Sequence, residues 1–267
     1  MALASEPFRP SASLLQTQGL RRLPSDGLGP FIKPEVAVRR TMAEKVIDQI
    51  PLRFDVGSIL ERARLDGTPD HLTLAARLAR DAGALGRPRA LYRASSPRRE
   101  TERTVVVDGV TLTSRVLRVN LDQADRVFPF VATCGWELDR WVTEKDEPLE
   151  RRVADVISEV ALYLVLGALK ERLREEYHLT TISRMSPGSL EDWPLQEQRA
   201  LFQLFDDTER AVGVRLTKDL MMLPRKSLSG ILFASEELFE SCLLCPREEC
   251  PARLLPYDRD LFARRYL

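Results

Sequence analysis

The sequence predicts an α+β fold in which helices pack on a mostly antiparallel sheet, and three segments support this prediction. In "RTVVVDGVTLTS" two β-branched runs flank Asp108-Gly109, a dipeptide that accepts the positive φ angles of a tight hairpin turn. The stretch "RVFPFVATCG" is largely apolar and is typical of a buried strand. Residues 148–175 predict a long helix with Pro148 in its first turn, and segment 160–169 is apolar on almost every side, which indicates a place in the core.

The N-terminal part of the chain divides into two regions of different character. Residues 1–34 are rich in Pro, Gly and Ser and have no sustained hydrophobic period, so we expect an irregular arm. Residues 35–100 form a region that we predict to be helical, because apolar side chains recur at helical spacing. The segments with this spacing are 36–50, 58–66 and 69–85.

Further along the chain, strand and helix patterns alternate. "RVLRVNL", residues 115–121, alternates and predicts a strand. "WPLQEQRALFQLF", residues 193–205, predicts a helix with Asp192 as its N-cap. Residues 214–235 contain two strand-like runs around Pro224. We find no internal repeat.

Charge and composition exclude several classes of function. The 267 residues carry 40 Lys and Arg against 40 Asp and Glu, so the chain lacks the basic excess of a general nucleic-acid or membrane-surface binder. The most apolar run, residues 160–169, has half of the about 20 residues that a membrane span needs. No targeting signal is evident, which predicts a cytoplasmic protein with reduced thiols. The G-x-G-x-x-G, P-loop and G-x-S-x-G signatures are absent from the sequence.

The segment "SRMSPGSLEDWPLQEQ", residues 183–198, has features of a ligand site. Gly188 allows a backbone to approach a ligand closely, and Arg184 offers a planar fork of donors that suits a carboxylate. The start of the following helix would add free N–H groups. This composite suits a small molecule that carries a carboxylate or a zwitterion. The alternative is an ordinary strand–turn–helix connection with a surface arginine.

The same segment resembles the activation domain of cobalamin-dependent methionine synthase, in particular the free-standing versions of that domain. The resemblance covers roughly residues 100–240. Its most specific parts are the R-x-x-P-G element, Arg184 to Gly188, and the "LT…P…SLSG…F" block, Leu216 to Phe233. It implies a twisted antiparallel sheet with flanking helices, and it identifies residues 101–238 as a domain that binds S-adenosylmethionine (AdoMet).

The resemblance also implies roles for individual residues. Arg184 would hold the AdoMet carboxylate, and the backbone around Ser186, Pro187 and Gly188 would line its amino-acid or adenosine end. Ser189 stands where the family usually has a tyrosine that contacts the ligand, so AdoMet affinity is in question at this position. Trp193 is a candidate for a replacement aromatic surface. The resemblance assigns no catalytic residue.

Three cysteines, Cys242, Cys245 and Cys250, lie in a C-terminal tail, residues 239–267, at C-x2-C-x4-C spacing. Thiolates are soft ligands for zinc or an iron–sulfur cluster, and the spacing places the first two sulfurs on one tight turn. A fourth ligand would come from Cys134, if the fold brings it near, or from outside the chain. The alternative is that the thiols are structural or unused.

Two hypotheses of function follow. In the first, the chain binds AdoMet and supports reductive methylation of cobalamin on a corrinoid protein or a cobalamin-dependent methyltransferase, with a cluster in the tail or a separate electron-donor protein supplying the electron. The chain would then be a methyltransferase component. In the second, it is a non-catalytic metal- or iron–sulfur-binding adaptor that has kept the fold and lost AdoMet, as Ser189 suggests.

Overall fold

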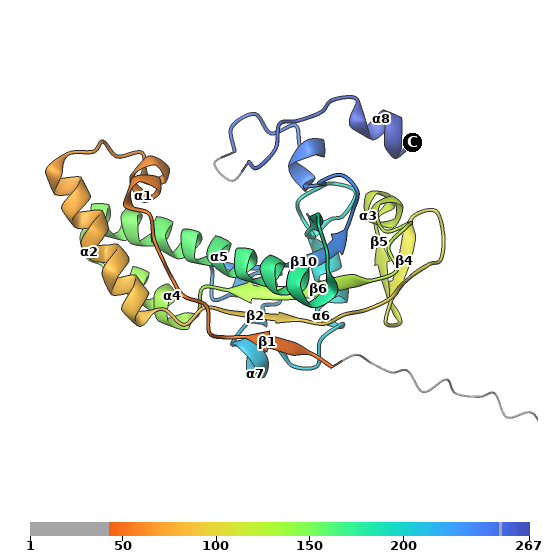
Figure 1. Ribbon diagram of the computed structural model, residues 1–267, viewed down its shortest axis with the longest axis horizontal. Helices are drawn as coiled ribbons and strands as arrows, with labels where there is room; N and C mark the ends of the chain where they lie inside the picture. The colour runs from red at the N-terminus through yellow and green to blue at the C-terminus, as the bar shows by residue number, and fades with distance from the viewer. Residues whose placement is uncertain (1–42, 251–252) are drawn as a thin grey trace, which may run out of the picture. The chain divides into compact units, whose positions relative to one another are not determined.

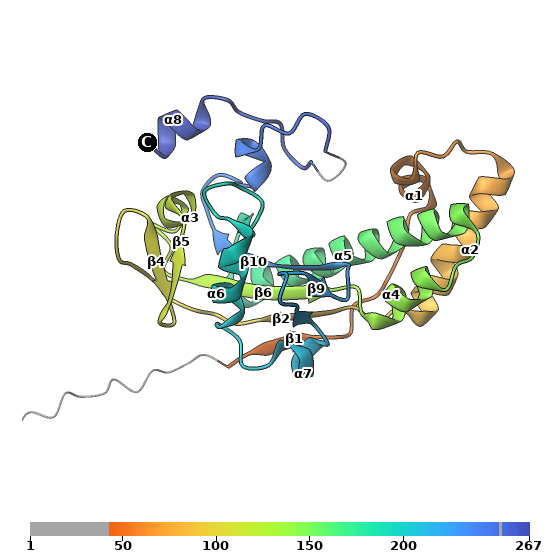
Figure 2. The ribbon, with the colours of Figure 1, turned by 180° about the vertical axis from the view of Figure 1, so that it is seen from behind.

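The computed structural model describes residues 43–250 and 253–267 (Figures 1 and 2). The predicted arm, residues 1–34, lies outside them. A five-stranded sheet in which every pair of neighbours is antiparallel forms the centre of the fold. In spatial order its strands are β1 (Lys45–Ile47), β2 (Arg89–Tyr92), β6 (Val127–Thr133), β10 (Ser227–Ala234) and β7 (Ile182–Met185). The predicted α+β class is therefore confirmed.

The long helix α5 (Pro148–Tyr177) covers one face of this sheet (Figure 1). All seven residues of β6 are buried, which is expected of a strand with both faces covered. Because side chains alternate along a strand, Phe128 and Phe130 pack toward α5, whereas Val127 and Val131 pack into the core on the opposite face. The long central helix predicted from the sequence is present, and Pro148 is in its first turn.

Smaller elements cover the opposite face and extend the fold at one end. The predicted hairpin is confirmed: Asp108 and Gly109 have φ angles of 46° and 85° and join two strands of a three-stranded sheet. That sheet consists of β3 (Pro97–Arg99), β4 (Thr104–Val107) and β5 (Val110–Thr113). The other elements of this part are α3 (Arg115–Asn120), η1 (Leu195–Glu197), α6 (Gln198–Phe202), α7 (Thr208–Val212), β8 (Arg215–Leu216) and β9 (Met222–Leu223).

At the other end, three helices pack around the N-terminal half of α5 (Figure 2). They are α1 (Val56–Ala63), α2 (Pro69–Leu85) and α4 (Trp136–Thr143). The C-terminal tail contains a 3₁₀ turn, η2 (Ser241–Leu244), and a short helix, α8 (Leu261–Arg265). No helix in the described ranges is long and apolar enough to cross a membrane.

Three predicted elements differ from the structure. The described part of segment 36–50 contains strand β1, which pairs with β2, in place of a helix. Segment 115–121 forms helix α3 and not a strand, because the Ser114 hydroxyl accepts a hydrogen bond from the Leu117 amide and caps the helix. The helix expected over 193–205 is reduced to the 3₁₀ turn η1 and the short helix α6.

The domain boundaries inferred from the sequence stay a prediction. The described residues, 43–250 and 253–267, belong to one compact unit. Strand β2, from the region expected to be helical, pairs with β6 of the central part.

Candidate ligand site

The R-x-x-P-G element begins on an edge strand of the main sheet. Arg184 lies on β7 opposite Leu232 of β10, and the turn that follows contains Gly188. Gly188 has a φ of +82°, and its N–H donates to the Trp193 carbonyl at 2.8 Å. A Cβ at this position would also lie 3.0 Å from Leu195. Glycine is therefore required by conformation and by space.

The two sequence blocks that carry the family resemblance meet in space at Gly230. This residue belongs to the "SLSG" part of β10, and a Cβ on it would overlap the Met185 carbonyl oxygen and lie 2.7 Å from the Ser186 hydroxyl. The missing side chain lets β7 and the start of the turn lie directly against β10. Gly230 thus helps to fix where the turn projects from the sheet.

The end of the turn is anchored to helix α3 through Asp192. Its carboxylate accepts hydrogen bonds from the Ser114 hydroxyl and, at 2.9 Å, from the Val116 amide. The prediction that Asp192 caps the helix after it is therefore wrong: it supports the N-terminus of α3. Trp193 is fully buried, so it offers no aromatic surface to a ligand, contrary to expectation.

Arg184 makes its ion pair within the protein. Its Nη2 and Nε atoms lie 3.0 and 3.2 Å from Oε2 of Glu240, in the C-terminal tail. The other carboxylate oxygen of Glu240 lies 3.2 Å from Nζ of Lys170 on α5. The side chains of Arg184, Lys170 and Glu240 are only 15, 17 and 5% exposed. A largely buried carboxylate is therefore held between two cations.

A pocket of about 810 Å³ opens between the turn and the tail. Gly188 and Ser189 line it from one side and Cys245 from the other. Its other lining residues are Val116, Leu190, Glu191, Asp192, Pro194, Leu195, Leu244, Pro246, Arg247, Tyr257, Asp258, Arg259 and Phe262. Its volume is in the range of small-molecule sites, about 300–1,000 Å³. Arg184 is not among the lining residues, because its guanidinium binds Glu240.

The structure places the residues predicted to bind AdoMet in different surroundings. Gly188 and Ser189 line the pocket, whereas Arg184 is bound to the tail. Ser186 is half-buried, and its hydroxyl oxygen has no hydrogen-bond partner among the described residues. Pro187 is half-buried beside it. Their role in ligand binding stays a prediction.

Lys170 and Glu240 did not emerge from the sequence. Lys170 is the first charged residue after the apolar run of α5. A lysine at the edge of an apolar helix segment often keeps its charged end close to a polar group, and this position was the one available signal. Glu240 follows two other glutamates, Glu236 and Glu237. In the sequence it is typical of an acidic residue exposed to solvent. Only the tertiary structure distinguishes it from them.

The structure does not bring the four cysteines together. Cys134 is fully buried among the helices at the far end of α5, whereas Cys242, Cys245 and Cys250 are half-buried in the tail. Across residues 43–250 and 253–267, no group of three or more His, Cys, Asp or Glu side chains is placed so that it could hold a metal ion. Metal binding by the tail cysteines stays a prediction.

Arg253 bonds to the backbone of two of the tail cysteines. Its guanidinium donates to the carbonyl oxygens of Cys242 and Cys245, each at 3.3 Å. The Cys242 sulfur accepts from the Leu254 amide at 3.4 Å. These hydrogen bonds join Arg253 and Leu254 to the segment around Cys242 and Cys245.

Burial should make Cys134 inert in the native protein. Desolvation raises the pKa of its thiol to about 12, so roughly one thiol in ten thousand is ionised at pH 8. We expect maleimide at pH 8 to modify the three tail cysteines of chelator-treated protein and to modify Cys134 only after denaturation. Peptide mass spectrometry measures this, with Cys242→Ser as the control that removes one native site. Rapid modification of Cys134 in folded protein would contradict this placement.

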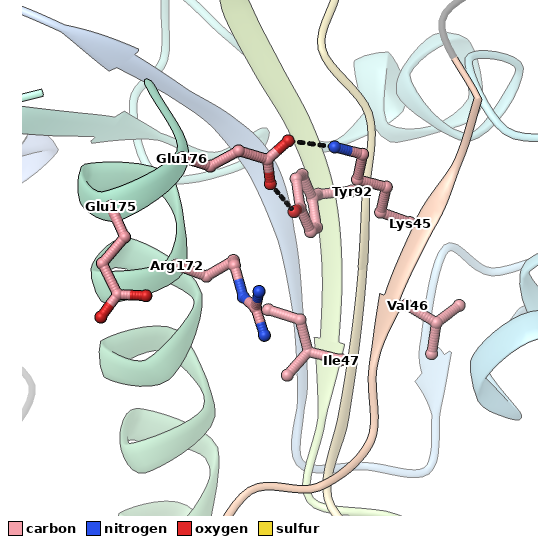
Figure 3. Close-up of a pocket in the computed structure, with 7 residues that line it drawn as sticks. All are labelled: Lys45, Val46, Ile47, Tyr92, Arg172, Glu175 and Glu176. Carbon is pink, nitrogen blue, oxygen red and sulfur yellow. Dashed lines mark hydrogen bonds and ion pairs between the residues drawn. The ribbon is translucent and has the colours of Figure 1, made fainter. Parts of the chain in front are cut away.

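A second pocket, of about 650 Å³, lies between β1, β2 and the end of α5 (Figure 3). Glu176 is central to it: its carboxylate pairs with Lys45 and accepts a hydrogen bond from the Tyr92 hydroxyl at 2.8 Å. Burial tends to raise the pKa of Glu176, but these hydrogen bonds outweigh it and the pKa is lowered. None of the residues predicted from the sequence lines this pocket.

Comparison with known proteins agrees with this architecture. The chain resembles a solved structure described as the crystal structure of the MetH reactivation domain bound to AdoHcy. The TM-score is 0.53 at 16% identity, and the match covers 76% of this chain and 82% of that one. At this identity the likeness shows the fold. No curated protein matches the chain.

A family comparison is more specific. Residues 168–240 match the family described as vitamin B12 dependent methionine synthase, activation domain. The resemblance inferred from the sequence is thereby confirmed for this segment. It extends from the second half of α5 through the R-x-x-P-G element to Glu240.

Proposed function

We propose that this chain is an AdoMet-binding accessory protein that supports reductive activation and methylation of a corrinoid on a partner. The partner would be a cobalamin-dependent methyltransferase or a corrinoid protein. The observation that carries the proposal is the position of the R-x-x-P-G turn, inside the matched family segment and at the edge of a pocket of suitable size. In this reaction AdoMet supplies a methyl group and an external donor supplies one electron to the partner's cobalt.

The described residues fit such a ligand in three respects. Gly188 lines the pocket and has no side chain of its own to keep a ligand from its backbone. Leu244 and Phe262 offer apolar surface for an adenine ring. The lining carries carboxylates, Glu191 and Asp258, that can attract a positively charged sulfonium. It also carries Arg247 and Arg259, so it offers both charges to a zwitterionic ligand. Arg184 is the donor that would hold a carboxylate, once Glu240 no longer occupies it.

Calorimetric titration with AdoMet tests the proposal. We expect Arg184→Ala to weaken AdoMet binding by roughly 10- to 100-fold, the value of a charge-assisted hydrogen-bonded pair. Decarboxylated AdoMet should bind wild type and variant equally, because it lacks the group that Arg184 would hold. Arg98→Ala, at a site 68% exposed, is the matched control and should bind as wild type does.

The chemical role needs a second assay. With a cob(II)alamin-loaded partner, AdoMet and a low-potential reductant under anaerobic conditions, we expect the absorbance of methylcobalamin to develop only in the presence of this chain. If calorimetry detects no AdoMet binding and no methylcobalamin forms, the proposed function is wrong.

One observation favours the adaptor hypothesis: Arg184 is already paired with Glu240, in a chain that has Ser189 in place of the family's tyrosine. An adaptor that has lost AdoMet would give no heat with AdoMet in either the wild type or Arg184→Ala. Elemental analysis of anaerobically purified protein tests its metal-binding part. If the protein contains neither zinc nor iron, metal binding is ruled out as part of this hypothesis.

A further inference from the structure

The segment that precedes the cysteines is joined to the R-x-x-P-G strand through its backbone. The Arg184 amide donates to the Phe239 carbonyl at 3.2 Å, and the Phe239 amide donates to the Ser183 hydroxyl at 2.7 Å. Arg184 and Glu240 form an isolated parallel β-bridge. These contacts place the Glu240 side chain directly over that of Arg184.

The same segment also contacts the far end of the turn. The Ser189 hydroxyl donates to the Ser241 hydroxyl at 2.9 Å. Glu240 and Ser241 thus engage the first and last residues of the sequence R-M-S-P-G-S at once. We refer to residues 239–241 as the strap.

Charge makes the Glu240 contact a specific one. Both of its carboxylate oxygens are used, one by Arg184 and one by Lys170, and the residue is 3% exposed. Glu240 takes the Nε and Nη2 edge of the Arg184 guanidinium, and these are donors that a ligand carboxylate could use. A second carboxylate therefore cannot bind the same donor atoms while Glu240 remains.

We propose that Glu240 is an internal competitor for the ligand carboxylate, and that the strap must release Arg184 before a carboxylate ligand binds fully. The exchange is balanced in charge, since one carboxylate replaces another between the same two cations. The apparent affinity for the ligand is then lowered by the fraction of molecules in which the strap is open. This inference rests on the proposed function, in which Arg184 binds the ligand carboxylate and AdoMet is the ligand.

The side chain of Phe239 and the segment that follows the strap are anchored by other contacts, so the strap can open without displacing the rest of the tail. Phe239 is 2% exposed and packs edge to face with Tyr266, with ring centroids 6.3 Å apart. The Tyr266 hydroxyl in turn donates to Asn120 at 2.9 Å. On the other side, the Asp258 amide donates to the Leu243 carbonyl at 2.9 Å. Movement of Glu240 does not require the tail to leave the core.

Glu240→Gln tests the proposal, because glutamine keeps the size of the side chain and removes its charge. We expect the variant to bind AdoMet about tenfold more tightly than wild type, since the closed strap loses its charge-assisted bonds. Decarboxylated AdoMet should bind both proteins equally. Glu237→Gln removes the same charge from an exposed neighbour and should leave AdoMet affinity unchanged.

Unchanged or weaker AdoMet binding by Glu240→Gln would overturn the proposal. If neither protein binds AdoMet, the proposed function fails, and hydrogen exchange on ligand-free protein tests the strap by itself. The Arg184 and Phe239 amides should then exchange faster in Glu240→Gln than in wild type or Glu237→Gln. Equal exchange in all three proteins would show that Glu240 does not hold the strap closed.

Discussion

Gly230→Ala is expected to lower the free energy of unfolding by about 3 kcal/mol, the upper part of the range for overpacked cores. The added Cβ would overlap the Met185 carbonyl oxygen, which is backbone and cannot rotate away. It would also lie 2.7 Å from the Ser186 hydroxyl. Strand β7 must therefore separate from β10, which disturbs the start of the R-x-x-P-G turn as well as the sheet.

Urea unfolding monitored by circular dichroism measures this loss. Gly167→Ala is the matched control, because a Cβ there meets nothing within 4 Å and the residue is exposed in the middle of α5. That change should raise the free energy of unfolding by about 0.5–1 kcal/mol, since alanine is the better helix former. If both variants destabilise the protein alike, close approach at Gly230 is not the reason for its glycine.

The elements that were predicted correctly are those whose signals are local. Asp108-Gly109 fixes the hairpin because the positive φ angles it requires are a property of two adjacent residues. Helix α5 was evident because a long segment with an apolar centre and Pro148 in its first turn is typical of a central helix. The R-x-x-P-G turn was recognised for a similar reason, since Gly188 meets a requirement within its own loop.

The elements that were predicted wrongly depend on distant partners. Strand β1 forms because Val46 pairs with Leu91, although four-residue spacing of apolar side chains around it is equally typical of a helix. Helix α3 is supported by the carboxylate of Asp192, which is 76 residues from the Val116 amide that it binds. Neither contact can be predicted from a local sequence pattern, because its two residues lie far apart in the chain.

The candidate site shows the same limit. Arg184 was identified from its own motif, but its partner Glu240 is 56 residues away, and Lys170 is 70 residues from Glu240. The sequence of the tail drew attention to cysteines, whose chemistry is conspicuous. The structure adds that the glutamate before them is the residue that contacts the motif. A buried charged pair is established only by the fold.

Trp193→Ala is expected to cost about 3–5 kcal/mol of unfolding free energy, as for other large aromatic side chains removed from a core. Trp193 is fully buried, and its carbonyl accepts the Gly188 N–H that closes the turn. Loss of the indole leaves a cavity beneath the R-x-x-P-G element, so the turn loses the packing that holds it beside the pocket.

Trp193→Phe separates packing from hydrogen bonding at this position. The indole Nε1 has no hydrogen-bond partner among the described residues, so phenylalanine gives up no bond and leaves only a smaller cavity. We expect the free energy of unfolding to fall by about 1–2 kcal/mol and AdoMet affinity to stay close to that of wild type. Urea unfolding and calorimetry on both variants measure these effects. Equal losses for Phe and Ala would show that a phenyl ring restores none of the packing, which would contradict this account.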